Sequence, residues 1–288
     1  MRTDEDSRPR QKSGVRQRIM EEKRNFILGL GHQKCGTSWL YKYLCRSDLF
    51  AEGYAKEFHV WDRLDIPIFE NRRSKLKLKH IFNKTKVRDY RMENSLGYYF
   101  DYFEKLMRDG KFVTADITPS YSALRAKRLI KIRQEFQERN IGVKVVILVR
   151  DPLSRIKSAV RFNLDRGIYS EGISKWEKNF ESALEEYYKN EHCLVRTTYQ
   201  NIILEASKVF DEKDIFIGFY ENMFEDDEIR RISKFLGIDA EIEFSGVYVN
   251  KTTSSVFETK LDSEIKNFYD DTYRFFYENY PISKRLWL

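Results

Sequence analysis

The fold of this chain is decided by residues 26–44, FILGLGHQKCGTSWLYKYL. The stretch begins with a short apolar run, which is typical of a buried parallel strand. Gly31 and Gly36 bracket the turn that follows, where the missing Cβ atoms let backbone N–H groups approach an anion closely. From Thr37 onward apolar residues recur at helical spacing, which predicts a helix whose positive N-terminal end faces that anion. We therefore expect a strand, a phosphate-binding loop and a helix.

The spacing from Gly31 through Gly36 to Ser38 matches a nucleotide-binding P-loop, in which a lysine follows the second glycine and reaches the β- and γ-phosphates. Here Thr37 occupies that position, and the lysine of the loop is Lys34. The loop keeps the phosphate cradle and lacks the triphosphate lysine. A glycine turn without a ligand is the alternative, but the lysine, threonine and serine together favour an anion.

Composition sets the domain organisation. The 288 residues are 41% hydrophobic and 15% aromatic, enough to fill the core of one large α/β domain, which we place at residues 25–288. The net charge of +7 suits an anionic cofactor or substrate. Because the basic residues are spread along the chain, no nucleic-acid partner is expected. The cysteines have neither metal-ligand spacing nor a disulfide pattern; they are Cys35, Cys45 and Cys193.

Residues 1–24 lack the apolar core of a signal peptide, and the chain has no membrane-spanning apolar run. We expect a disordered tail here and a soluble, cytoplasmic protein. The segment 63–90 is rich in Arg and Lys. It is either a solvated face or a mobile basic flap that gathers an anionic acceptor or the cofactor.

A second stretch, residues 52–62, contains candidate proton acceptors. If it is extended, the period of two places Glu57, His59 and Trp61 on one face. Group transfer to a hydroxyl requires removal of its proton, which a carboxylate or imidazole within hydrogen-bond reach can accept. A glutamate with its usual pKa of about 4.3 is a weaker base than a histidine near 6.5, unless burial raises it. Both residues remain candidates, and a polar strand end without a catalytic role is the alternative.

Two further stretches end in polar turns. Residues 111–121 predict a strand followed by a proline turn, and ligands of open α/β sheets bind beyond such strand ends. A simple turn is the alternative. Residues 143–149 give the strongest central-strand signal, and Pro152 suits the first turn of a following helix. Arg150 and Ser158 can then converge on one phosphate. Asp151 could also be read as a Mg²⁺ ligand of a kinase-like site. We disfavour this role because a lysine can stabilise the leaving phosphate without a metal.

Together these stretches resemble the sulfotransferases that use 3′-phosphoadenosine 5′-phosphosulfate (PAPS). Residues 34–38 resemble their 5′-phosphosulfate loop, and residues 150–158 match their 3′-phosphate motif, Arg-(Asn/Asp)-Pro-x-x-Arg-x-x-Ser. Residues 56–62 resemble the Lys-Glu-x-x-Phe-Phe-Asp segment of heparan-type and related carbohydrate members, whose glutamate is the general base. Residues 118–121 resemble the turn that contacts the acceptor. The resemblance covers about residues 25–260.

The chain also departs from the family pattern. Val60-Trp61 replaces the usual aromatic pair, which puts the substrate shape in doubt more than the chemistry. Asp116-Ile117 replaces an acid-lysine pair, so the substrate-binding lysine of the family has no counterpart. The family landmarks Tyr220-Glu221 and Phe235-Leu236-Gly237-Ile238 are kept as fold markers. Because residues 1–24 lack an apolar segment, we expect the chain to resemble the soluble bacterial-type members and not the Golgi-anchored ones.

The resemblance implies a three-layer, P-loop-like α/β fold with a mainly parallel central sheet flanked by helices. It also implies transfer of a sulfuryl group from PAPS to an acceptor hydroxyl, with a carbohydrate as the expected acceptor, 3′-phosphoadenosine 5′-phosphate (PAP) as the product and no metal. Lys34 would donate to the oxygen that bridges phosphorus and sulfur. Glu57 is the favoured base and His59 the alternative.

The expected site residues fall into two groups. A polar segment at 249–255 is either a surface turn or a loop that closes over the adenosine, and it adds three candidates for the cofactor. The cofactor-binding residues are expected to be Lys34, Cys35, Gly36, Thr37, Ser38, Trp39, Arg150, Ser158, Lys251, Thr252 and Thr253. The acceptor-binding residues are expected to be Lys56, Glu57, Thr118, Pro119, Ser120 and Tyr121.

Two other functions remain open from the sequence. A P-loop kinase acting on a small molecule would need Mg²⁺ and ATP, and the displaced lysine argues against it. A non-catalytic polyanion-binding protein would fit the net charge of +7 and would bind sulfated or phosphorylated polymers without turnover.

Overall fold

The computed structural model describes residues 24–77, 82–169, 171–176, 179–246 and 258–287. Within these residues a five-stranded sheet has the order β2-β3-β1-β4-β5. Every neighbouring pair in it is parallel. The strands are β1 (Asn25–Gly29), β2 (Phe50–Ala51), β3 (Val113–Ile117), β4 (Gly142–Val149) and β5 (Ile215–Phe219).

The central strand β1 sets the position of the site. Asn25 of β1 is in register with Val113 of β3 on one side and with Gly142 of β4 on the other. The chain then leaves β1 toward β2 and leaves β4 toward β5, in opposite directions along the sheet. Crevices at such a reversal, beyond the carboxyl ends of the strands, are where open α/β sheets bind ligands.

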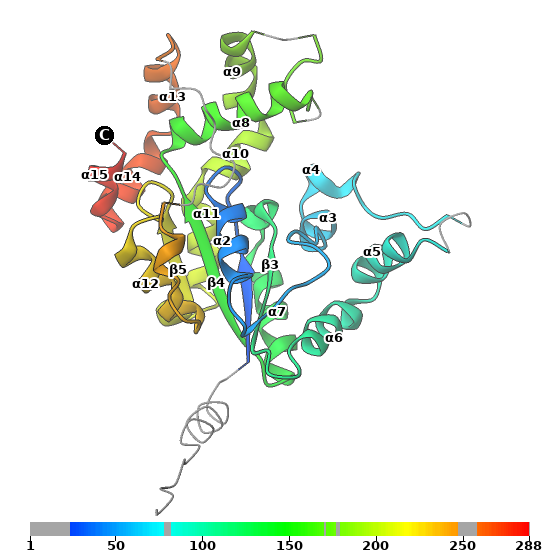
Figure 1. The fold of residues 1–288 in the computed structure, drawn as a ribbon. Coiled ribbons are helices and arrows are strands. Elements are labelled where there is room, and N and C mark those ends of the chain that lie inside the picture. The colour runs from blue at the N-terminus through cyan, green and yellow to red at the C-terminus, as the bar shows by residue number, and fades with distance from the viewer. Residues whose placement is uncertain (1–23, 78–81, 170, 177–178, 247–257, 288) are drawn as a thin grey trace, which may run out of the picture.

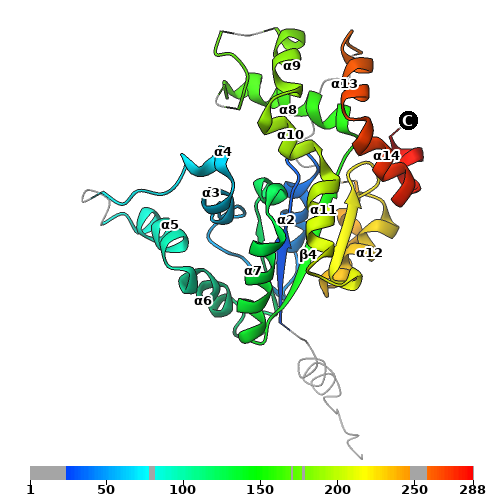
Figure 2. The same ribbon diagram turned by 180° about the vertical axis from the view of Figure 1, so that it is seen from behind.

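Helices cover both faces of the sheet, which confirms the three-layer α/β prediction. Figure 1 shows α2 (Thr37–Leu44) and α12 (Asp226–Leu236) in front of the sheet. Figure 2 shows α7 (Ala126–Glu138) and α11 (Tyr199–Ser207) on the opposite face. Apolar residues recur at helical spacing in α12, which ends at Gly237 in a left-handed conformation, as the sequence predicts.

Near the start of β1 the core is aromatic. The ring of Phe26 stacks on Phe136 of α7 with 4.1 Å between the centroids and meets Phe103 edge-on at 4.8 Å. Phe103 lies on α6 (Leu96–Leu106), and α5 (Lys84–Asn94) precedes it in the arm at the right of Figure 1. Stacked and edge-on aromatic pairs each add about 0.5–1.5 kcal/mol beyond the burial of their area.

The extended conformation considered for residues 52–62 is wrong for this segment. The strand β2 ends at Ala51, the chain then runs without regular structure, and α3 (Trp61–Asp65) begins at Trp61. Trp61 is fully buried against Tyr99, so it does not share a face with Glu57 and His59. The physical reason is that an indole packs into the aromatic core, which overrides the alternation of the sequence. The short helix α4 (Pro67–Glu70) follows α3.

The carboxyl end of the sheet is covered by helices that follow β4. These are α8 (Pro152–Arg166), α9 (Phe180–Tyr188) and α10 (Glu191–Thr197), at the top of Figure 1. The C-terminal segment forms α13 (Asp262–Phe268), α14 (Asp270–Asn279) and α15 (Ile282–Leu286). At the end of this segment the ring of Trp287 packs on the ring of Phe276, with 4.8 Å between the centroids.

In the described part of the chain, no helix combines the length and the apolar composition that a membrane crossing requires. Residues 1–23, which make up nearly all of the predicted tail, lie outside the described residues, as do the candidate cofactor residues Lys251, Thr252 and Thr253.

Candidate active site

The loop between β1 and α2 forms a cradle for an anion. Gly36, the residue before α2, has a φ of 92°, a left-handed value that favours glycine. A Cβ atom added there would lie 2.4 Å from Sδ of Met223. The first N–H groups of an α-helix have no partner inside the helix, so those of α2 can donate to a phosphate. The structure therefore supports the cradle that the sequence predicts.

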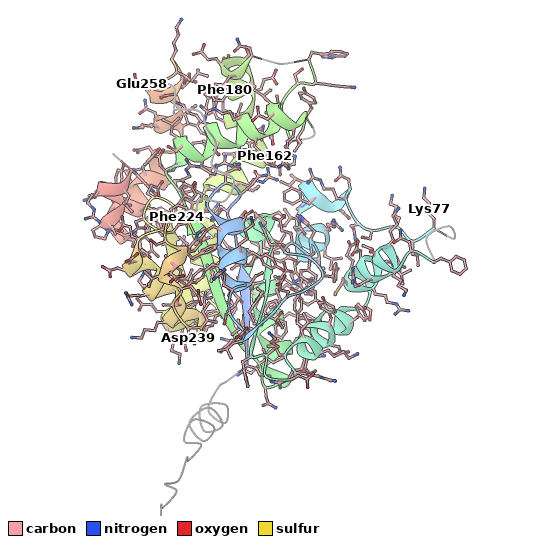
Figure 3. All side chains as sticks on the ribbon, viewed as in Figure 1. Lys77, Phe162, Phe180, Phe224, Asp239 and Glu258 are labelled. Carbon is pink, nitrogen blue, oxygen red and sulfur yellow. The ribbon has the colours of Figure 1, made fainter. Side chains whose placement is uncertain are left out.

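Lys34 lies in this loop and lines a cavity of about 320 Å³. Its Nζ atom is 4.4 Å from the ring centroid of Phe162, which α8 carries above the loop (Figure 3). Burial lowers the pKa of Lys34, and the nearby charges of Arg150 and Arg166 lower it further. A cation held this way, among other cations, gains most from a negatively charged ligand.

The second phosphate motif meets the loop at the end of β4. Arg150 donates from Nη1 to the backbone oxygen of Lys34 at 3.4 Å, and its guanidinium lies 4.4 Å from the ring of Tyr220. Ser158 of α8 lines the same cavity. The two motifs, more than a hundred residues apart in sequence, thus come together at one site. Asp151 is engaged elsewhere, because it accepts hydrogen bonds from the backbone N–H of Ser154 and from the hydroxyl of Tyr273, both at 2.7 Å.

Cys35 in the loop and Trp39 in the first turns of α2 have buried polar atoms. The side chain of Cys35 is fully buried, and its Sγ atom points toward the backbone oxygen of Gln33. Its backbone N–H already donates to His32 at 3.2 Å. Trp39 lines the cavity and stacks on Tyr43, and its buried Nε1 has no partner among the described residues. Cys35 therefore shapes the loop, whereas Trp39 lines the cavity.

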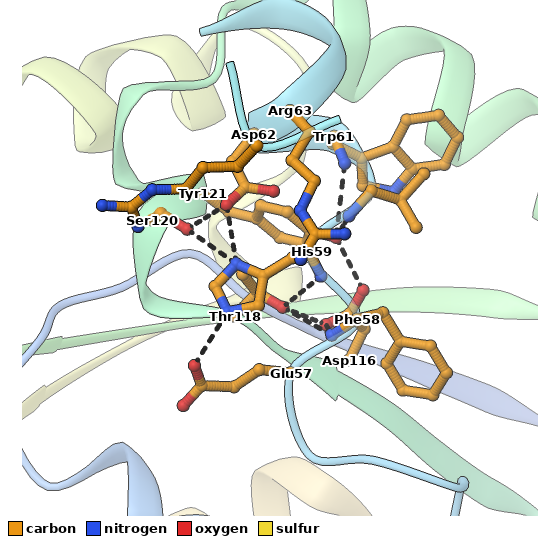
Figure 4. Close-up of polar contacts among 12 residues, drawn as sticks. Glu57, Phe58, His59, Trp61, Asp62, Arg63, Asp116, Thr118, Ser120 and Tyr121 are labelled. Atoms are coloured by element: carbon orange, nitrogen blue, oxygen red, sulfur yellow. Dashed lines mark hydrogen bonds and ion pairs between the residues drawn. The ribbon is translucent and has the colours of Figure 1, made fainter. Parts of the chain in front are cut away.

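The candidate bases form a connected group at the cavity wall (Figure 4). His59 lies between two carboxylates, with Nε2 at 3.2 Å from Oε2 of Glu57 and Nδ1 at 2.7 Å from Oδ2 of Asp62. Burial lowers the pKa of His59, but the hydrogen bonds to Asp62 and Glu57 outweigh burial and raise it to about 9. At neutral pH the imidazole is therefore protonated and cannot accept a proton.

Glu57 is the ionised partner in this group. Burial raises its pKa, but the hydrogen bond from His59 and the charge and hydrogen bond of Lys56 outweigh burial and lower it to about 2. It also lines the cavity. The structure thus offers Glu57 as the group that is deprotonated at neutral pH and in contact with the space for a ligand.

Lys56 connects the bases to the phosphate loop. Its Nζ atom donates to the hydroxyls of Thr37 and Ser38, both at 3.2 Å, and lies 2.7 Å from Oε1 of Glu57. One ammonium group therefore contacts both the expected cofactor site and the expected base.

The residues of the turn at 118–121 have two different roles. Pro119 and Ser120 line the cavity. Thr118 and Tyr121 are buried below it and donate to the carboxylate of Asp116, at 2.6 and 2.8 Å. Thr118 accepts a hydrogen bond from the backbone N–H of Phe58, as Figure 4 shows. Tyr121 accepts one from the backbone N–H of Val60, so the two side chains hold the segment that presents the bases. Burial raises the pKa of Asp116 to about 6, against the hydrogen bonds it receives.

A family model described as a sulfotransferase domain matches residues 24–279. The chain belongs to the sulfotransferase family. Enzymes of this family transfer a sulfuryl group from PAPS, so this protein is a PAPS-dependent sulfotransferase. Its family membership agrees with the resemblance of the phosphate loop and the 3′-phosphate motif.

One solved structure supports the fold of this sulfotransferase, and a second is similar to it at a lower score. A sulfotransferase from Alicyclobacillus acidocaldarius is similar over 86% of this chain and 92% of its own, with 21% identity and a TM-score of 0.54. A mouse sulfotransferase complexed with PAP is similar over 92% of this chain and 87% of its own, with 15% identity and a TM-score of 0.47. Among curated proteins, no sequence matches this one significantly.

Several residues of the sulfotransferase site were not among the candidates from the sequence. Asp62 is 2% exposed, binds His59 and also accepts a hydrogen bond from Ser120. A signal for it existed, because it is the aspartate that ends the Lys-Glu-x-x-Phe-Phe-Asp segment. Three more residues line the cavity from separate segments; they are Arg72, Glu171 and Arg196. Arg72 belongs to the basic segment 63–90, for which a flap that gathers an anion was one alternative, whereas no local pattern marks Glu171 and Arg196.

Proposed function

We propose that this sulfotransferase transfers the sulfuryl group of PAPS to a hydroxyl of a carbohydrate, with Glu57 as the general base. The observation that carries the proposal is the shared cavity, which joins Lys34, Arg150 and Ser158 to Glu57. A carbohydrate acceptor is supported by the resemblance of residues 56–62 to carbohydrate members. It is also supported by the charged and polar side chains that accompany Glu57 in the lining, since these suit a ligand rich in hydroxyls.

The donor set of the cavity fits PAPS. The cradle at Gly36 and the first N–H groups of α2 suit the 5′-phosphate, and the fork of Arg150 with the hydroxyl of Ser158 suits the 3′-phosphate. When bound, PAPS supplies an activated sulfuryl group whose bond to the phosphate oxygen breaks as the bond to the acceptor oxygen forms.

Three side chains have assigned roles in this reaction. Glu57 accepts the proton of the acceptor hydroxyl, so that no positive charge builds up on the attacking oxygen. Lys34 stabilises the negative charge that develops on the phosphate oxygen released from sulfur. His59, protonated below a pKa of about 9, holds the carboxylate of Glu57 by its Nε2–H and is itself held by Asp62.

Thermal unfolding with PAP, Mg²⁺–ATP or adenosine 5′-phosphate tests the cofactor site. Selective stabilisation by PAP is expected, of about 2.7 kcal/mol at a ligand concentration near 100 times its dissociation constant. Arg150→Ala should abolish this stabilisation because the 3′-phosphate loses its charged partner. Stabilisation by Mg²⁺–ATP alone would support a kinase instead.

Glu57→Gln tests the base in the same preparation. We expect PAP stabilisation close to that of the native chain and a loss of turnover of about 10²–10⁴-fold, the usual contribution of a general base. Equal loss of PAP binding in Glu57→Gln and Arg150→Ala would contradict the separate roles. Binding of sulfated polymers without any turnover would favour a polyanion-binding protein. A soluble, cytoplasmic location remains part of the proposal.

A further inference from the structure

Part of the cavity lies outside the cofactor motifs and the bases. It is lined by Arg72, which follows α4, by Glu171, between α8 and α9, and by Arg196 in α10. These residues come from three segments that are distant in sequence, and all of them are charged. Charged side chains at a ligand cavity fix the orientation and the chemical class of the ligand.

Arg196 and Glu171 form a closed pair. Nη1 and Nη2 of Arg196 donate to the two oxygens of Glu171 at 2.6 and 2.9 Å, and both side chains are less than 9% exposed. Burial raises the pKa of Glu171, but Arg196, together with the charge of Arg72, outweighs burial and lowers it to about 2. Such a bidentate pair neutralises itself and has few donors left for a ligand.

Arg72 is placed differently. Its Nη2 atom is 3.6 Å from Oε1 of Glu171, beyond hydrogen-bond distance, and its side chain is 39% exposed. The guanidinium rests on the ring of Phe69 at 5.3 Å from the centroid. From this position Arg72 lines the cavity.

The charges around the bases are already balanced. At neutral pH the cations Lys56 and His59 face the carboxylates of Glu57 and Asp62. Arg72 lies within ion-pair distance of Glu171, but both oxygens of that carboxylate already accept hydrogen bonds from Arg196, so the charge of Arg72 is only partly compensated in the described part of the cavity. The acceptor side therefore has an excess of positive charge, separate from that of Lys34 and Arg150.

We propose that Arg72 binds an anionic group of the acceptor, a carboxylate or a sulfate ester, while the acceptor hydroxyl lies at Glu57. The planar fork of arginine matches both anions by two parallel hydrogen bonds. The inference rests on the proposed function, because it concerns the acceptor of the same transfer.

Matched glycosides test this inference by titration into the PAP-saturated protein. The probes are phenyl β-glucoside, phenyl β-glucuronide and phenyl β-glucoside 6-sulfate. We expect at least one anionic glycoside to bind about tenfold more tightly than the neutral one, as one charge-assisted hydrogen-bonded contact provides. In Arg72→Gln this preference should shrink to about twofold or less, whereas PAP affinity should not change and so reports a folded protein.

Arg73→Gln is the matched control. It removes the same charge at the next position, where the side chain is exposed and outside the lining found for the described residues, so the preference should persist. Equal affinity for all three glycosides, no binding of either anionic glycoside, or a preference that survives Arg72→Gln would overturn the inference. The proposed function fails separately, if PAP does not bind or if no glycoside accepts a sulfuryl group. Transfer to the neutral glycoside without anionic preference would overturn the role of Arg72 alone.

Discussion

Two carboxylates beside one imidazole have different tasks in this cavity. Glu57 lines the space for a ligand, whereas Asp62 is buried behind His59 and reaches the reaction only through it. Both hold His59 in the protonated form, but only Glu57 can meet an acceptor hydroxyl. We therefore regard Asp62 as a positioning residue and Glu57 as the catalytic one.

Asp62→Asn should change the pH profile of the enzyme. Because His59 has a raised pKa, its charge is present below about 9 and is lost as the pH rises through that value. Without the carboxylate of Asp62 this pKa falls, so the alkaline decline in kcat moves to lower pH. We also expect kcat at pH 8 to fall by roughly tenfold or more, as Glu57 loses its oriented donor. The measurement is kcat against pH from 6 to 10.

Asp65→Asn on the same helix is the control for this variant. Its carboxylate pairs with Arg128, away from the cavity, so the pH profile should stay that of the native enzyme. An Asp62→Asn profile with an unshifted alkaline limb would show that Asp62 only supports the fold.

At the level of elements, the loop that precedes α2 depends on one backbone conformation. Gly36→Ala places a Cβ atom at a φ of 92° and within 2.4 Å of Met223. We expect a loss of about 1–3 kcal/mol in the free energy of unfolding and a weaker affinity for PAP, because the cradle must shift. Chemical denaturation and PAP titration measure the two effects.

Gly97→Ala provides the comparison. Gly97 lies in α6, where an added Cβ would meet nothing within 4 Å. Alanine is the better helix former by roughly 0.5–1 kcal/mol, so this variant should be as stable as the native chain or more stable. Equal PAP affinity in Gly36→Ala and the native chain would argue against the loop as the phosphate site.

Elements with a local pattern could be predicted from the sequence. The continuous apolar run of β4 and the glycine-bounded loop before α2 carry their own signal, so the sequence alone offers Lys34, Arg150 and Ser158 as candidates, and all three line one cavity. The segment 52–60 was not predicted, because its conformation is imposed by Thr118 and Tyr121 from a distant turn. Arg72, Glu171 and Arg196 meet only after folding, and no spacing in the sequence connects them.

In the whole molecule, the residues that stabilise the fold and the residues of the active site lie at opposite ends of the sheet. The aromatic cluster of Phe26, Phe103 and Phe136 lies at the start of β1, and the cavity lies beyond its carboxyl end. Phe136→Ala should lower the free energy of unfolding by about 3–5 kcal/mol, the usual cost of emptying a buried aromatic site. Urea denaturation measures it, with KM for PAPS as the second readout, expected to be unchanged.

Phe82→Ala is the matched control because Phe82 is 95% exposed, so its removal should leave stability unchanged. A large rise in KM for PAPS in Phe136→Ala, measured where the variant is fully folded, would show that the two ends of the sheet are coupled.

The ammonium group of Lys56 has a consequence for the order of events in a catalytic cycle. While it touches Glu57 it weakens that base, and a cofactor phosphate arriving at Thr37 and Ser38 competes for the same charge. In an enzyme that has bound only the acceptor, Lys56 therefore still contacts Glu57, and Glu57 remains a weak base. We expect a compulsory order of binding, with PAPS before the acceptor. Glu57 would then remove the proton of the acceptor hydroxyl only when a sulfuryl group is bound and ready for transfer.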